Sequence, residues 1–164
     1  MVHTKKPEPV QDEWQALSKD DAWHQVGNII TPIHNVWDPP PDSERPFDFL
    51  TYKNRTFLLV AYLETEVMNG GYNQWFHNPT GAFVAEARVA ARDMGMDYLA
   101  DLIRDAEVEY FSQHYAGLPD TTRVDSLEQF DLQYEAWRPD ILRHMLRWWH
   151  TTDENGKTLS TTQS

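Results

Sequence analysis

The segment TYKNRTFLLVAYLETEVMNGG, residues 51–71, decides how this chain folds. Apolar residues lie on most faces of a helix drawn through residues 51–68, which is typical of a helix at the centre of a core. Asn69, Gly70 and Gly71 then predict the end of that helix, because glycine readily takes the positive φ of a C-terminal cap. The sequence therefore predicts a central buried helix around which the rest of the chain packs.

Apolar residues recur at steps of three and four along most of the remaining chain, which is the spacing of amphipathic helices. No segment alternates apolar and polar residues in the way that a half-buried strand does. The expected helices cover residues 14–17, 18–37 with an interruption at Pro32, 71–78, 82–94, 96–113, 126–137, and a last one from Pro139. We therefore predict an all-α fold, a single compact domain of about six to nine helices.

The two ends of the chain differ from its middle. Residues 1–11 are polar and contain two prolines, so we expect a flexible N-terminal lead. Residues 151–164 are also polar, and we expect a disordered C-terminal tail there. No break in composition and no internal repeat divides the stretch between them. Residues 12–150 are therefore predicted to form one helical domain.

Composition limits the function further. The 164 residues include no cysteine, which excludes a disulfide framework, a thiolate zinc site and a cysteine nucleophile. No apolar run approaches the roughly 18 residues of a membrane span, and no apolar stretch of a signal peptide follows the N-terminal lysines. We expect a cytoplasmic protein with no membrane partner.

The charge of the chain is strongly negative. It carries 26 acidic and 14 basic residues, for a formal net charge of −12. Such a surface repels nucleic acid and attracts basic proteins, so we expect no direct binding of nucleic acid. From Asp93 to Asp140, 12 acidic residues are opposed by only three arginines. Much of the negative charge is thus concentrated in less than a third of the chain.

Part of this stretch forms a regular row. Asp93, Asp97, Asp101, Asp105 and Glu109 follow one another at steps of four, so on a helix they are neighbours that repel one another. A sequence selected only for stability would place Lys or Arg in some of these positions. The row favours a surface that engages a basic, DNA-reading protein, while a solvated face of an acidic protein explains it equally well. The candidate partner-binding residues are Asp97, Asp101, Asp105 and Glu109, supported by Asp120, Asp125, Glu128 and Asp131.

Other chemistry finds little support in the sequence. No His-Glu-x-x-His spacing and no calcium-loop pattern is present, so we expect no metal site and no cofactor. Glu64 and Glu66 are two residues apart, and on a helix they point about 200° from each other, so they cannot share a substrate. No glycine-rich phosphate loop and no nucleophile elbow occurs. We therefore predict a binding protein and not an enzyme.

Residues 66–78, EVMNGGYNQWFHN, resemble a motif of a bacterial family of acidic proteins. That motif reads Glu-x-x-Asn-Gly-Gly-aromatic-x-Gln-aromatic-aromatic-x-Asn, and the best understood member of the family is a DNA-mimic protein of Neisseria. The matching residues are Glu66, Asn69, Gly70, Gly71, Tyr72, Gln74, Trp75, Phe76 and Asn78. The resemblance implies a folding motif in which Asn69 and the glycines close a helix and the aromatic residues fill the core. Glu66 and Gln74 would then satisfy buried backbone groups.

The resemblance also implies an all-α fold and a role in transcription regulation. The characterised member is understood to bind the DNA-binding face of a helix-turn-helix repressor and so to free the operator. Together with the row of acids, this predicts a DNA mimic that blocks the operator binding of a helix-turn-helix transcription factor. An immunity protein that neutralises a basic nuclease toxin and an uncharacterised enzyme are the alternatives. Whether the chain forms a homodimer stays open.

Overall fold

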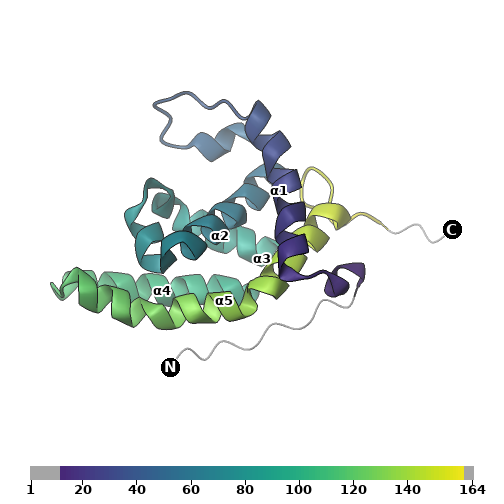
Figure 1. The fold of residues 1–164 in the computed structure, drawn as a ribbon. Coiled ribbons are helices and arrows are strands. Elements are labelled where there is room, and N and C mark those ends of the chain that lie inside the picture. Colours follow the sequence, from purple (N-terminus) through teal and green to yellow (C-terminus); the bar gives the residue numbers. More distant parts are fainter. Residues whose placement is uncertain (1–11, 161–164) are drawn as a thin grey trace.

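The structure, a computed structural model, describes residues 12–160, except for the side chains of residues 120–125. This part of the chain contains five α-helices, three short 3-10 helices and no strand beyond an isolated bridge, so the predicted all-α fold is confirmed (Figure 1). The α-helices are α1 (Lys19–Val36), α2 (Tyr52–His77), α3 (Val84–Asp93), α4 (Asp97–Tyr115) and α5 (Asp120–Thr151). The 3-10 helices are η1 (Glu13–Ala16), η2 (Pro46–Phe49) and η3 (Pro79–Phe83).

The number of α-helices is lower than the predicted six to nine, because helices that the sequence appeared to separate are continuous. Pro139 lies inside α5, which changes direction along its length instead of ending (Figure 1). Residues 51–68 and 71–78 are joined in α2 across a kink at Gly70 and Gly71, whose φ and ψ are not helical.

Helix α1 runs without the interruption that Pro32 predicted. The proline removes the amide that would bond to the carbonyl of Asn28, but Asn28 is exposed, so water can satisfy that carbonyl. At its start, the hydroxyl oxygen of Ser18 accepts a hydrogen bond of 3.1 Å from the backbone N–H of Asp21. Ser18 is therefore the N-cap of α1.

The core lies where α2 and α5 meet the other helices. Helix α5 packs against α1, α2 and α4, and α3 packs between α2 and α4. The predicted central position of α2 is confirmed, because a continuous run of its residues, from Thr56 to Ala61, is buried. Side chains of α2, α4 and α5, such as Phe57, Leu102 and Ile141, are fully buried in one cluster. Helix α4, which starts at Asp97, is therefore anchored to the core.

The C-terminal tail departs from the prediction of disorder beginning at residue 151. Residues 152–160 fold back along α2: the buried Lys53 Nζ donates a hydrogen bond of 2.6 Å to the Thr152 carbonyl, and Thr152 bridges to Thr158. The amine of Lys53 also lies 4.6 Å from the centroid of the Trp149 ring. A buried ammonium group needs such acceptors, and it fixes this segment in place. Residues 1–11 and 161–164 lie outside the described part of the chain.

Candidate protein-binding surface

Helix α4 presents the predicted row of acids on the side away from the core. Leu99, Leu102, Ile103, Ala106 and Tyr110 are all buried, as their spacing required, and they turn the opposite face outward. Asp97 is exposed in the first turn, where a negative charge suits the helix dipole. Asp101 and Asp105 follow it at one-turn intervals and are partly exposed. The structure thus brings these three acids together on one outer face.

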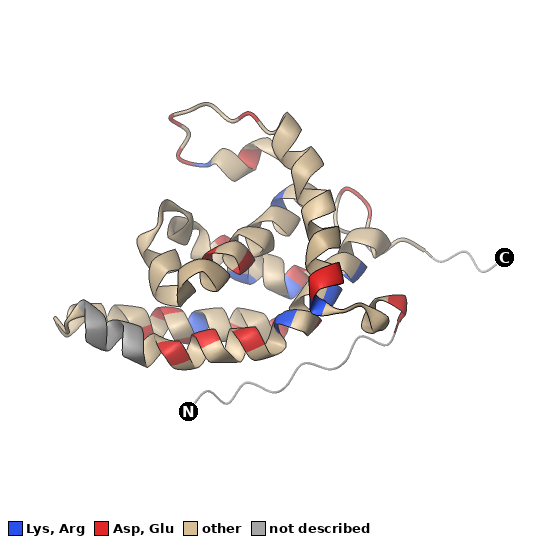
Figure 2. Ribbon diagram, in the orientation of Figure 1, with Lys and Arg blue, Asp and Glu red and all other residues tan. Residues whose placement is uncertain are grey.

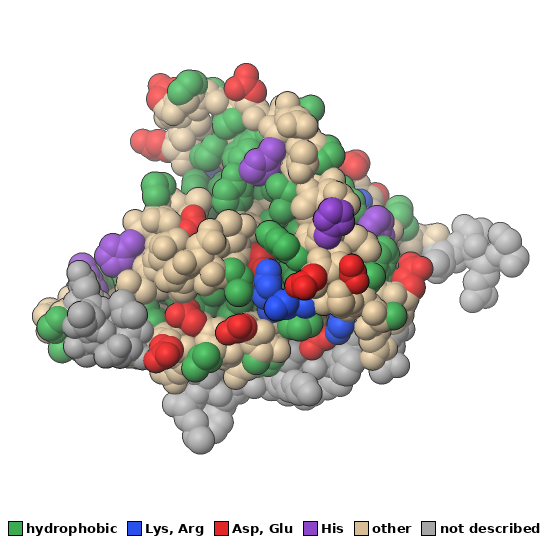
Figure 3. Space-filling view, in the orientation of Figure 1, with side chains coloured by type: hydrophobic (Ala, Val, Ile, Leu, Met, Phe, Trp, Pro, Cys, Tyr) green, Lys and Arg blue, Asp and Glu red, His purple; other side chains and the backbone are tan. Residues whose placement is uncertain are grey.

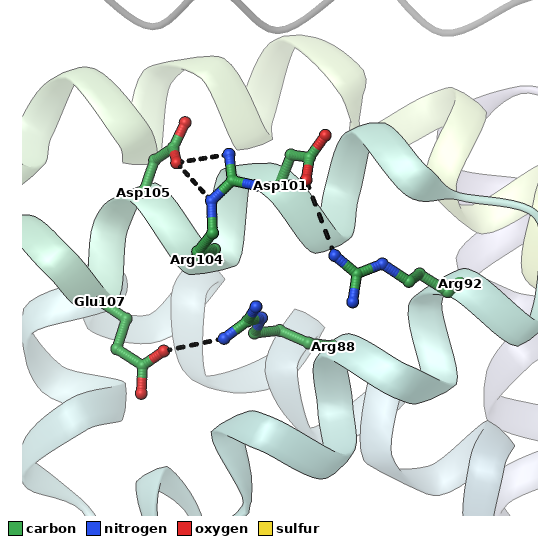
Figure 4. A network of polar contacts seen from close by, with 6 residues as sticks. All are labelled: Arg88, Arg92, Asp101, Arg104, Asp105 and Glu107. Atoms are coloured by element: carbon green, nitrogen blue, oxygen red, sulfur yellow. Dashed lines mark hydrogen bonds and ion pairs between the residues drawn. The ribbon is translucent and has the colours of Figure 1, made fainter.

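Arginines compensate this face to a degree that the sequence did not predict (Figure 4). The Arg104 guanidinium lies between two acids, 2.9 Å from Asp101 Oδ1 and 2.8 Å from Asp105 Oδ1. Arg92 of α3 reaches across to Asp101 at 3.8 Å. The hydrogen bond to Asp105 raises the pKa of Arg104 above its ordinary value. The row is therefore an alternation of charges and not a bare stripe of carboxylates.

A second ion pair between α3 and α4 belongs to the same network and is less exposed. Arg88 of α3 lies 3.3 Å from Glu107, and both side chains are about three-quarters buried. Arg88 and Arg92 stand four residues apart, so they share one face of α3. That spacing was the only sign of these ion pairs in the sequence. It could not be interpreted without the packing of α3 against α4.

Glu109, the last acid of the row, turns toward α5. The side-chain amide of Gln113 donates to the Glu109 carboxylate and also contacts the Ser126 hydroxyl of α5. Gln113 itself is buried. Glu109 therefore helps to join the two helices, and its carboxylate is less available to a partner than that of Asp97.

Of the four predicted acids of α5, the structure describes the side chains of Glu128 and Asp131. Asp131 accepts a hydrogen bond of 2.8 Å from the backbone N–H of Tyr72, and burial raises the pKa of this carboxyl. Glu128 is exposed one turn earlier, on the same side of α5. Asp131 thus bonds to α2, whereas Asp101 pairs with Arg92 of α3. Asp120 and Asp125 lie outside the described side chains.

Acidic residues are consequently spread over the molecule (Figure 2). On the face that Figure 3 displays, acidic side chains lie singly or in small groups among hydrophobic and neutral ones. The outer face of α4 is the part in which three of the predicted acids, Asp97, Asp101 and Asp105, stand in line.

The residues of the 66–78 motif organise the kink of α2. Glu66 accepts hydrogen bonds from the side chains of Gln74 (3.3 Å), Asn78 (2.7 Å) and Thr80 (3.0 Å), where the resemblance had implied backbone partners for Glu66 and Gln74. Tyr72 and Trp75 are buried, with ring centroids 6.1 Å apart, and the Phe76 ring stacks on Trp75. Glu66, before the kink, is thus tied to the second arm of α2, residues 72–77, and to η3.

Asn69, which the resemblance had implied as a helix-closing residue, precedes the two glycines inside α2. Gly71 has a φ of 75° and a ψ of 179°, a conformation essentially restricted to glycine. The second arm of α2 starts directly after Gly71. The Asp131 carboxylate caps it by accepting a hydrogen bond from the backbone N–H of Tyr72.

A buried ionic network was also missed. Glu64 is fully buried, accepts a hydrogen bond of 2.6 Å from the Tyr134 hydroxyl, and pairs with Arg138 Nε. Burial and the adjacent Glu64 carboxylate raise the pKa of Tyr134 well above its ordinary value. A glutamate on an otherwise apolar helix was the only hint in the sequence. Its partners lie 70 and 74 residues away, so the pairing emerges only with the fold.

The described residues offer an open hollow but no metal cluster. The hollow, of about 300 Å³, lies between η2, α2 and α3, and Arg45, Tyr52, Arg55 and Asp93 line it. Its polar groups largely bond to neighbours, as in the pairs Arg45–Asp48 and Tyr52–Asp93. No group of three metal-ligating side chains converges among the described residues, and no described helix is long and apolar enough to cross a membrane.

Comparison with known proteins gives one match. The family model of the DMP19-like proteins matches residues 48–152, which is more than half of the chain and runs from η2 through α5. Comparisons with curated proteins and with solved structures gave no match. The matched range contains both the 66–78 motif and the acids of α4.

Proposed function

Because the chain belongs to the DMP19-like family of DNA-mimic proteins, we propose that it binds the basic, DNA-reading surface of a helix-turn-helix transcription factor and keeps that factor from its operator. The family match supports mimicry as the role. The kind of partner is our proposal, and one observation carries it: Asp97, Asp101 and Asp105 stand in line on the outer face of α4.

The spacing of the row suits a surface that reads phosphates. Acids four residues apart are separated by about 6 Å along a helix axis. Phosphates of one DNA strand follow at about 3.4 Å along the duplex axis, so the row offers roughly one carboxylate for two phosphates. A basic protein surface that pairs with alternate phosphates would therefore meet carboxylates in a similar register.

Arg104 gives this row a defined geometry. Like charges at one-turn intervals repel and weaken a helix by a few tenths of a kcal/mol per pair. The guanidinium between Asp101 and Asp105 offsets that repulsion and fixes both carboxylates. Arg104 also cancels part of the charge, which would lower affinity for basic surfaces in general and favour a partner that matches the arrangement.

The proposed activity is binding alone. Association would be fast at low salt and would weaken as salt rises, because long-range attraction between exposed charges is screened. An immunity protein would use its acids in the same way against a basic nuclease, so the identity of the partner decides between the two functions.

A capture experiment tests the proposal. The immobilised chain is exposed at low salt to a nuclease-treated lysate of its own host, and the retained proteins are released with duplex DNA containing candidate operators. We expect DNA to release a helix-turn-helix regulator, whose operator binding the free chain then inhibits. Release of a nuclease that the chain inactivates would establish the immunity function instead. Retention of no protein that DNA can displace would contradict mimicry.

A further inference from the structure

The outer face of α4 changes character halfway along the helix. Val108, Phe111 and Tyr115 follow the acids at steps of three and four, so they lie on one face of the helix. Their exposed fractions are 62%, 43% and 84%. An exposed helix face is ordinarily polar, and apolar side chains gathered over successive turns mark an interaction surface. We call these three residues the apolar end of α4.

The aromatic rings at this end are held in place. Phe111 contacts the edge of the Tyr110 ring at 5.3 Å between centroids, and Tyr115 contacts Phe111 at 6.5 Å. Tyr110 is 7% exposed and belongs to the core. The exposed rings are therefore linked to a buried ring by an edge-on and a tilted contact, which restrict their motion before a partner covers them.

Mimicry of DNA does not account for the apolar end. Val108 lies three residues after Asp105, so the acidic row continues directly into it. Basic side chains can stack on single Phe or Tyr rings, but Val108 offers them neither a charge nor a ring. A partner that covers both halves of α4 must present an apolar patch beside its basic surface.

We propose that the apolar end of α4 binds such a patch on the DNA-binding protein that the acids engage, and that it selects this protein among the basic proteins of the cell. This inference rests on the proposed function. The acids supply attraction to any basic surface, which is strong but unselective. Burial of apolar area acts only at contact and rewards a complementary shape, so it supplies the discrimination.

The contributions of the acids and of the apolar end to the affinity can be distinguished, because they depend differently on salt concentration. Pairing of exposed charges weakens as salt rises, whereas burial of apolar surface changes little over the same moderate range. The acids therefore set how steeply the affinity for the partner falls as the salt concentration rises. The apolar end adds a part of the affinity that is the same at each salt concentration.

The test compares two double variants of the full chain. Phe111→Gln/Tyr115→Gln removes the rings without changing charge, and glutamine keeps the helix favourable. Val36→Gln/Phe49→Gln is the matched control, because these side chains are 78% and 59% exposed on α1 and η2, away from α4 in Figure 1. The probe is the regulator that DNA releases in the capture experiment, titrated at several salt concentrations.

We expect the Phe111→Gln/Tyr115→Gln variant to bind roughly tenfold more weakly at every salt concentration, with the slope of the wild type. The control should bind like the wild type. Equal affinity of both variants, with a normal slope, would overturn this inference and leave the proposed function standing. A wild-type affinity that does not depend on salt would instead contradict the proposed function.

Two further measurements control for dimerisation of the free protein and for misfolding of the variant. Sedimentation velocity of the free proteins shows whether the variant turns a wild-type dimer into a monomer, in which case the apolar end binds a second copy and the inference is wrong. Hydroxyl-radical labelling of the wild type does not depend on a variant folding. We expect the regulator to protect Phe111 and Tyr115 from labelling, and equal labelling with and without it would contradict the proposal.

Discussion

Carboxylates in two regions of this molecule do different work. At the junction of α2 and α5, Glu64 is fully buried and Asp131 is partly buried, and both accept hydrogen bonds from the other helix. On α4, Asp101 and Asp105 share one exposed arginine and keep much of their surface in water. A charge taken out of water must be paired or it destabilises the fold, whereas an exposed pair contributes little. The position of a carboxylate in the fold, and not its residue type, thus decides whether it stabilises the fold or stays exposed to a partner.

Breaking the Glu64 network should have the largest effect on stability. Glu64→Leu leaves Arg138 buried without its acceptor, and we expect the free energy of unfolding to fall by about 3–5 kcal/mol. Urea unfolding followed by circular dichroism measures it. The double variant Glu64→Leu/Arg138→Leu should recover much of the loss, since it strands no charge. A double variant as unstable as Glu64→Leu would show that the arginine is not the cause.

A substitution at the kink of α2 should have the second largest effect on stability. Gly71→Ala would place a Cβ 2.3 Å from Asp131 Oδ2 at a φ that side chains rarely adopt, and we expect a loss of about 2–3 kcal/mol. Gly27→Ala is the matched control, because it lies in α1 with nothing within 4 Å of the added Cβ. Replacing that helical glycine should stabilise the protein by about 0.5–1 kcal/mol. Thermal unfolding that moves both variants in the same direction would contradict this account.

Removing the cap on the second arm of α2 should cost less. Asp131→Ala deletes the acceptor for the Tyr72 N–H, and we expect a loss of about 1 kcal/mol in urea unfolding. An unchanged stability would mean that Asp131 does not hold this junction and would return it to the set of acids available to a partner.

The same residue predicts a dependence on pH. Burial raises the folded pKa of Asp131 above its unfolded value, so its contribution to stability is complete below the unfolded pKa and declines as pH rises through the folded pKa. Asp131→Asn keeps an acceptor oxygen but cannot ionise. From about pH 4 upward, the stability of the wild type relative to this variant should therefore fall. A relative stability that rises with pH would reverse the assigned sign.

The surface network should show the smallest change in stability and a clear change in binding. Arg104→Gln uncovers the charges of Asp101 and Asp105, and we expect unfolding to change by less than about 1 kcal/mol. Association with the captured regulator at low salt should become severalfold faster. Arg45→Gln, which breaks an exposed pair with Asp48 elsewhere, is the control. A slower association of the Arg104 variant would mean that the arginine itself contacts the partner.

The sequence predicted the parts of this fold that depend on local spacing. The buried face of α4 and the central position of α2 both follow from apolar residues a few positions apart. It missed the continuity of α5 through Pro139 and the ordering of residues 152–160 on Lys53, because packing between distant segments decides both. For the same reason, the spacing along the chain put Asp97, Asp101 and Asp105 in a row but did not show that Arg92 of α3 lies beside Asp101. It also could not distinguish Asp131 from a surface acid.

Matched charge reversals test the central claim most directly. Asp97→Lys/Asp101→Lys/Asp105→Lys inverts the outer face of α4, and Asp38→Lys/Asp42→Lys/Glu44→Lys makes the same change in charge on an exposed loop between α1 and η2. Circular dichroism first shows that both variants keep the fold, and each then competes with operator DNA for the captured regulator over a range of salt. We predict that the α4 variant loses competition and the loop variant retains most of it. Equal loss in both would show that only the net charge matters, and full competition by the α4 variant would contradict the assignment of this face.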